Sequence, residues 1–294
     1  MVYPMKYQSV FRPGLFAGQT IIVTGGGSGL GRCTAHELAS LGATVALVGR
    51  KIQKLNALQQ EITAAGGQAS VHVCDIRYEA LATSMGSTVL AQHGAIHHLV
   101  NNAGEQFPAL AKDLTLNGWE AVIKNNLTDG FLVSRECYTQ WMEDHGGAIV
   151  NIIADIWGDM PHMAHSGAAR VGMLSLTETL ACEWAHSGVR VNTVAPGWIA
   201  SSGFDTYTPE VQAEMRGWKK KVPLQRFGTE AEISAAIVFL LSEAASFITG
   251  SCLRIDGGVP NARHTWTMIP HQRSKPFEGF PLATQPKSQA VQDE

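Results

Sequence analysis

The chain has 294 residues, 45% of them hydrophobic and 16% charged, with a formal net charge of −3 at pH 7. This composition is typical of a globular protein that buries a sizeable core without metals or disulfide bonds. The charge balance and the lack of a long basic run argue against nucleic-acid binding, and no apolar run is long enough to predict a membrane span.

The cysteines and the N-terminus bear on the compartment. The five cysteines are odd in number and show no CxxC or zinc-binding spacing, so we expect reduced thiols and no metal site. The N-terminus lacks the long apolar stretch of a signal peptide, and we therefore expect a cytoplasmic protein. The cysteines are Cys33, Cys74, Cys137, Cys182 and Cys252.

Apolar, β-rich runs alternate with segments of helical periodicity from Gln19 onward. Strands of this kind predict a parallel sheet with helices on both faces, an α/β Rossmann-like, doubly wound fold. Strands are predicted at 20–25, 44–50, 70–75, 97–104, 148–155, 189–197 and 252–258, and helices at 33–43, 51–67, 78–93, 117–142, 167–188 and 230–242.

The same pattern suggests how the chain is divided. Residues 1–258 are predicted to form one domain with an N-terminal arm, in which 200–228 is the least regular part. Residues 259–294 are rich in Pro, Gln, Ser and charge without periodicity. We expect them to form an extended or partly disordered C-terminal extension.

A glycine-rich turn separates the first predicted strand from the first helix. Glycines at such a turn allow backbone N–H groups to approach a pyrophosphate at a helix N-terminus, where the helix dipole favours anions. Because the turn opens a βαβ unit, it predicts dinucleotide binding. The candidate residues are Gly25, Gly27, Ser28, Gly29, Leu30 and Gly31.

The end of the second strand bears on the choice of cofactor. A carboxylate there would bind the ribose hydroxyls of NAD(H) and repel a 2′-phosphate. This chain has Arg50 and Lys51 instead, and the Arg50 guanidinium can pair with a phosphate. The sequence therefore favours NADP(H) over NAD(H), although a basic, solvated start of the next helix explains the same residues.

Further motifs complete a family pattern. They are the spaced glycines Gly25, Gly29 and Gly31, then Asp75, Asn101–Gly104, Asn126, Val191–Asn192 with Pro196–Gly197, and Asp256–Gly258. With these motifs, roughly residues 15–258 resemble the short-chain dehydrogenase/reductases.

The resemblance implies a homodimer or homotetramer and assigns several cofactor contacts. It places Asp75 and Ile76 near the adenine. It implies that Asn102, Ala103 and Gly104 line the cofactor, and that Pro196, Gly197 and Ile199 lie beside the nicotinamide carboxamide.

The family's catalytic Asn, Ser, Tyr and Lys are only partly present. Asn126 is kept, but the Ser position carries Ala154, the Tyr position Ser166 and the Lys position Arg170. Spacing of four residues on a helix keeps Ser166 and Arg170 on one face. Arginine holds its proton, so Arg170 is expected to hold the cofactor ribose, and an aliphatic hydroxyl is a poor proton donor near neutral pH.

These changes favour one type of reduction. Alcohol–carbonyl interconversion needs a matched acid at the reacting oxygen, whereas reduction of an α,β-unsaturated thioester mainly needs a stabilised oxyanion. The stretch from His165 to Arg170 is similar to that of peroxisomal trans-2-enoyl-CoA reductases. The whole chain is similar to citronellol/citronellal dehydrogenases of acyclic terpene utilisation, which implies alcohol or aldehyde chemistry. A nucleotide-binding protein without turnover is a third reading.

Side chains near the end of the fifth strand are candidates for the remaining roles. With Asn126 and Ser166, Asp155 is expected to organise water or the oxyanion; otherwise it is a loop carboxylate. Trp157 and His162 are predicted to contact an apolar acyl-CoA or terpenoid substrate, with exposed loop positions as the alternative for histidine. Trp198 and Phe204 either join this wall or pack a lid over the core.

Overall fold

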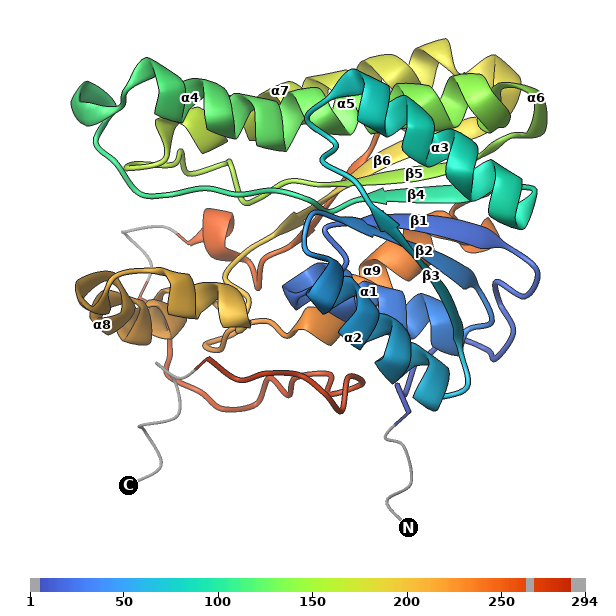
Figure 1. Ribbon diagram of the computed structural model, residues 1–294. Coiled ribbons are helices and arrows are strands. Elements are labelled where there is room, and N and C mark those ends of the chain that lie inside the picture. Colours follow the sequence, from blue (N-terminus) through green and yellow to red (C-terminus); the bar gives the residue numbers. More distant parts are fainter. Residues whose placement is uncertain (1–5, 263–266, 287–294) are drawn as a thin grey trace.

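Seven parallel strands form one sheet in the computed structural model, which describes residues 6–262 and 267–286 (Figure 1). The strand order is β3-β2-β1-β4-β5-β6-β7. Consecutive residues such as Ile21, Ile22 and Val23 are fully buried, because both faces of the sheet are covered. The strands are β1 (Thr20–Thr24), β2 (Thr44–Gly49), β3 (Gln68–Val73), β4 (His98–Asn101), β5 (Gly147–Ile152), β6 (Val189–Pro196) and β7 (Cys252–Ile255).

Two helical layers sandwich this sheet, and the Rossmann-like prediction is confirmed (Figure 1). Leu38 and Ile237 belong to the core between the sheet and α1, α2 and α9, and Met85 and Leu180 to the core beneath α3, α5 and α7. The helices are α1 (Gly29–Ser40), α2 (Ile52–Ala64), α3 (Glu79–His93), α4 (Leu116–Ile123), α5 (Asp129–Cys137), α6 (Glu143–His145), α7 (Ala164–Glu183), α8 (Pro209–Trp218) and α9 (Glu230–Leu241).

The position of β1 between β2 and β4 creates a topological switch point. Chain connections leave β1 and β4 in opposite directions across the sheet, and ligands of such folds bind outside the carboxyl ends of the strands at this point. The loops after β1, β4, β5 and β6 all emerge at that edge. They carry most of the predicted site residues.

Two predicted segments differ from the structure. The prediction of irregular chain over 200–228 was wrong in its centre, where α8 follows Thr208 and begins with Pro209. Val211, Met215 and Trp218 lie on one face of α8 and pack in an aromatic cluster, so helical spacing was present but short. The single helix predicted over 117–142 is interrupted by two π-helical turns, Lys124–Thr128 and Tyr138–Met142.

The C-terminal segment 267–286 contains no helix or strand, yet it packs on the domain (Figure 1). Phe280 is buried and stacks on Tyr7 of the N-terminal arm with ring centroids 5.8 Å apart. Thr229 Oγ1 donates to the carbonyl oxygen of Phe277 at 2.9 Å. The two ends of the described chain thus lie together over α1 and α9. Disorder beyond residue 258 stays a prediction, since 263–266 and 287–294 lie outside the described residues.

Within 6–262 and 267–286, no helix combines the length and apolar character that a bilayer crossing requires.

Candidate active site

The glycine-rich turn after β1 is locked to the loop after β4. The Asn102 side-chain amide donates to the carbonyl oxygens of Thr24 at 2.9 Å and Gly25 at 3.2 Å. Gly25 has φ +64°, and a Cβ on it would lie 2.9 Å from Cα of Ala103. A Cβ on Gly31 would overlap the Asn102 amide and lie 2.6 Å from the Gly25 carbonyl oxygen. Only glycine permits this close approach.

The start of α1 has features of an anion-binding site, with the buried Glu230 carboxyl 3.9 Å from the position of a Cβ on Gly29. Its first turn contains no acidic residue, and the Ser28 side chain makes no capping hydrogen bond. The backbone N–H groups from Gly29 onward therefore point out of the helix end with the positive end of its dipole. This arrangement, with Gly27 and Leu30 in the same turn, fits the pyrophosphate of a dinucleotide.

Two guanidinium groups gather where the adenosine end of such a cofactor would lie. Arg50 Nη2 lies 3.2 Å from Glu105 Oε2, and both side chains are exposed, so the pair is weak and open to exchange for a phosphate. Asp75 accepts from Arg77 Nε at 2.8 Å and Nη2 at 2.6 Å, and these bonds hold the pKa of Asp75 below its usual value. Sequence reasoning missed Arg77.

Lys51 and Ile76 are the other two residues that were predicted to lie near the adenosine end of the cofactor. Lys51 is exposed and immediately precedes α2. Ile76 is buried in the core beneath α3.

Asn126 and Arg170 meet at the carboxyl edge of the sheet. The π-helical turn Lys124–Thr128 carries Asn126, whose Oδ1 accepts from Arg170 Nη2 at 3.2 Å. Arg170 Nη1 donates to the carbonyl oxygen of Ile152 at 2.7 Å. A Cβ on Gly104 would lie 2.7 Å from both Arg170 Nη2 and Asn126 Oδ1. The guanidinium is thus fixed against backbone that lines the predicted cofactor site.

A buried carboxyl group faces this guanidinium. Burial raises the pKa of Asp129 to about 8, and burial lowers the pKa of Arg170 to about 10 while the charge of Asp129 opposes that shift. Among the described residues, Asp129 Oδ2 and Arg170 Nε have no hydrogen-bond partner. Sequence analysis gave no role to Asp129, which lies one helical turn beyond Asn126.

Ser166 takes part in a chain of three polar side chains. It is fully buried in α7, and its Oγ donates to Gln106 Oε1 at 2.6 Å. Gln106 Nε2 in turn donates to the hydroxyl oxygen of Tyr207 at 3.3 Å. Gln106 comes from the loop after β4 and was missed from the sequence, where nothing marks it.

Asp155, in the loop after β5, has other neighbours than Ser166 and Gln106. Asp155 Oδ1 accepts from the Trp157 backbone at 3.3 Å, and its charged neighbours are Asp256 and Arg254. Burial raises the pKa of Asp155. The Arg254 guanidinium lies over the exposed Trp157 ring, 5.1 Å from its centroid. No hydrogen bond joins Asp155 to Ser166 within the described parts of the chain.

The remaining candidate substrate residues lie in two segments: His162 in the loop after β5, and Trp198 and Phe204 in the chain after β6. His162 is exposed with φ +65°, and its carbonyl oxygen accepts from the Ala109 backbone at 2.8 Å. Phe204 is 8% exposed and packs edge-on against Phe227. Trp198 packs on Trp218 with centroids 4.9 Å apart. The aromatic residues after β6 therefore form a cluster with α8, and both roles expected for Trp198 and Phe204 stay predictions.

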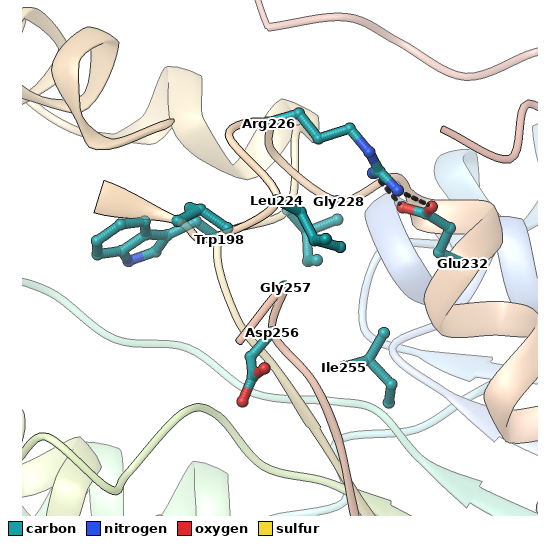
Figure 2. A pocket seen from close by; sticks show the side chains of 10 residues that line it. Trp198, Leu224, Arg226, Gly228, Glu232, Ile255, Asp256 and Gly257 are labelled. Atoms are coloured by element: carbon teal, nitrogen blue, oxygen red, sulfur yellow. Dashed lines mark hydrogen bonds and ion pairs between the residues drawn. The ribbon is translucent and has the colours of Figure 1, made fainter. Parts of the chain in front are cut away.

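A small cavity of about 140 Å³ lies behind the chain that follows β6. Figure 2 shows Trp198, Asp256 and Ile255 around it, with the Arg226–Glu232 ion pair at one side. Its lining includes Ile199, which pairs with Gly228. Gly197 leaves room for Asp256, whose Cα would lie 2.7 Å from a Cβ there. The segment Pro196–Ile199 is thereby held rigidly beside the predicted nicotinamide site.

In the part of the chain that the structure describes, no group of three His, Cys, Asp or Glu side chains is placed to hold a metal ion.

A family model and the relatives of this chain indicate the same family. The model of the family described as enoyl-(acyl carrier protein) reductase matches residues 25–260. A probable 2,4-dienoyl-CoA reductase of Bacillus subtilis is 38% identical over 243 residues, covering 82% of this chain and 96% of the relative.

Two solved structures share the fold over most of this chain. A citronellol catabolism dehydrogenase of Pseudomonas aeruginosa is 55% identical with a TM-score of 0.79, covering 86% of this chain and 100% of that one. A putative NAD(P)-dependent gluconate 5-dehydrogenase of Beutenbergia cavernae with bound NADP is 32% identical with a TM-score of 0.79, covering 85% and 100%. The family match and these likenesses agree with the glycine-rich turn and sheet order described above: the chain is an oxidoreductase of the short-chain dehydrogenase/reductase family.

Proposed function

We propose that the protein is an NADP(H)-dependent reductase of an apolar, branched enoyl- or dienoyl-CoA. One observation carries the proposal: the helix position where the family places a phenol and an amine holds the buried Ser166 hydroxyl and the Arg170 guanidinium. Neither is a matched acid for an alcohol oxygen, whereas a fixed cation at this position suits a reaction that develops an enolate. The names of the Bacillus subtilis relative and of the matching family model support this choice.

The residues present supply binding and electrostatics for such a step. Bound NADPH would supply a hydride for the far carbon of the conjugated system. Arg170, fixed by Asn126 and the Ile152 carbonyl, would hold the ribose and keep a positive charge near the reacting centre. The substrate oxygen gains negative charge, which hydrogen-bond donors at the site stabilise, and a proton from solvent or a nearby acid then reaches carbon. Asp155 is proposed to assist through water.

A substrate panel tests this proposal. We expect NADPH consumption with trans-2-enoyl-CoA and 2,4-dienoyl-CoA thioesters, and faster turnover of branched than of short straight chains. Absorbance at the NADPH band measures each rate, with citronellal as the carbonyl substrate and citronellol plus NADP⁺ for oxidation. Turnover of citronellal and citronellol alone would contradict thioester reduction. It would favour an alcohol or aldehyde dehydrogenase, the activity suggested by the name of the 55% identical structure.

The cofactor preference is tested at Arg50. Arg50→Asp is expected to weaken NADPH binding at least tenfold and to strengthen NADH binding, because a carboxylate repels the 2′-phosphate and accepts from ribose hydroxyls. Fluorescence titration of both nucleotides measures the two dissociation constants. Arg12→Asp, at an exposed arginine of the N-terminal arm, controls for the change in net charge. An unchanged preference in Arg50→Asp would rule out this role.

We further propose a homo-oligomer in the cytoplasm. Leu116 and Trp119 of α4 and Val171 of α7 are large apolar residues exposed on neighbouring helices, a feature of surfaces that pair with another copy. The five cysteines are all unpaired, which suits a reducing compartment.

A further inference from the structure

We propose that Tyr207, in the segment after β6, donates the hydrogen bond that stabilises the developing charge on the substrate's thioester oxygen. The inference rests on the reaction proposed above. It assigns a hydrogen-bonding role to a tyrosine that comes from a different element than α7, which carries Ser166.

The direction of the hydrogen bonds identifies Tyr207. The Ser166 hydroxyl donates its hydrogen to Gln106 Oε1 at 2.6 Å. Gln106 then gives an amide hydrogen to the Tyr207 oxygen at 3.3 Å. A hydroxyl can accept one bond and still donate its own hydrogen. Of the two hydroxyls in this chain, therefore, that of Tyr207 keeps its hydrogen for a substrate oxygen.

The chemistry of the two hydroxyls points the same way. Phenols, with a reference pKa of about 10, are stronger hydrogen-bond donors than aliphatic alcohols. A donor aimed at developing charge, already held by an accepted bond, needs little reorganisation when the charge forms. Ser166 then acts as a positioning residue, because its bond fixes the rotation of the Gln106 amide.

The backbone holds the tyrosine in place. The Tyr207 carbonyl oxygen accepts from Gln212 Nε2 of α8 at 2.8 Å. Its side chain also packs against the cluster formed by Phe204, Met215 and Phe227. The phenol thus reaches Gln106 only when the segment after β6 lies against the loop after β4. Placement of the donor therefore depends on the contact between this segment and the loop after β4.

In the step itself, a hydride supplied by bound NADPH would form a new C–H bond at the far carbon of the conjugated system, and the π electrons of that system would shift to the thioester oxygen. Tyr207 donates a hydrogen bond to that oxygen without losing its proton. The proton that ends on carbon is taken from solvent, so the step adds two hydrogens to the substrate and oxidises one NADPH.

Tyr207→Phe tests the inference with two readouts. The first is the absorbance of 2,4-hexadienoyl-CoA bound to the protein with NADP⁺, where no turnover occurs. A donor at the carbonyl oxygen polarises the dienoyl system and shifts its band to the red; we expect this shift in the wild type and its loss in Tyr207→Phe. The second is kcat for NADPH-dependent reduction, expected to fall about 100-fold with KM changing less than threefold.

Two further variants separate donation from structure. Tyr138→Phe removes a hydroxyl bonded to Ser187 outside the site, and should keep both the shift and kcat. Ser166→Ala should keep the shift with a smaller loss of kcat. A Tyr207→Phe protein that melts like the wild type and retains the shift and kcat would overturn the inference. If the wild type turns over only citronellal or citronellol, the proposed function fails. The role of Tyr207 is then tested separately on that substrate, where a kcat of Tyr207→Phe equal to that of the wild type would contradict it.

Discussion

Replacing Arg170 with methionine is expected to lower kcat/KM for NADPH-dependent reduction about 1000-fold, equivalent to about 4 kcal/mol of transition-state stabilisation. The guanidinium is buried and joins the Asn126 side chain to the Ile152 backbone. Methionine fills similar volume but leaves the Ile152 carbonyl oxygen without this donor, while Asn126 Oδ1 still accepts from the Glu105 backbone at 3.0 Å. It also removes the positive charge from the proposed reacting centre. The measurement is steady-state kinetics with NADPH and a dienoyl-CoA, together with nucleotide binding by fluorescence.

Two controls distinguish this effect from loss of stability. Arg170→Lys keeps a charge and restores the residue usual in the family; we expect it to recover activity to within about tenfold of the wild type. Arg190→Met removes another arginine, whose guanidinium bonds four backbone carbonyls near the end of α9. It should lower the melting temperature but leave the nucleotide dissociation constant unchanged. An Arg170→Met protein with more than a third of wild-type kcat/KM would contradict the proposed role.

Gly31→Ala is expected to weaken NADPH binding at least 100-fold. The new methyl group would overlap the Asn102 amide and lie 2.6 Å from the Gly25 carbonyl oxygen. The backbone oxygen cannot move without opening the turn that receives the pyrophosphate. Overpacking of this kind also costs about 1–3 kcal/mol of folding free energy. Calorimetric titration with NADPH and urea denaturation measure the two effects.

Gly217→Ala is the matched control for this substitution. Gly217 lies in α8, and a Cβ on it would meet nothing within 4 Å. Alanine there should leave NADPH affinity unchanged and stabilise the helix by up to about 1 kcal/mol. Equal NADPH affinity in Gly31→Ala and Gly217→Ala would show that the turn at Gly31 does not hold the cofactor.

Local patterns accounted for most of the fold. The spacing of neighbouring apolar residues predicts buried strands and amphipathic helices, so the bounds of the seven strands were predicted to within a few residues. The short helix α8 was missed because only three apolar positions, Val211, Met215 and Trp218, mark it. The π-helical turn at Asn126 was missed because its residues have the periodicity of ordinary helix over this length.

The candidate site divides along the same line. The glycine turn after β1 and the pair Ser166 and Arg170 could be identified from sequence, since short spacing on one element fixes their geometry. Asp155 was expected to organise water or the oxyanion, which stays a prediction, and the structure adds that its charged neighbours are Asp256 and Arg254. Because Asp155 follows β5, the sequence predicted at which edge of the sheet it lies. The course of the loop, which the sequence did not predict, determined its neighbours.

By itself, then, the sequence determined the doubly wound sheet, the glycine-rich turn after β1 and the loss of the phenol–amine pair on α7. Only the tertiary structure placed Gln106 on Ser166 across 60 residues and Tyr207 on Gln106 across 101. It likewise set the Asp129 carboxyl against Arg170. Periodicity and short motifs describe residues on one element, whereas these contacts join loops that meet only because parallel strands deliver their carboxyl ends to a common edge.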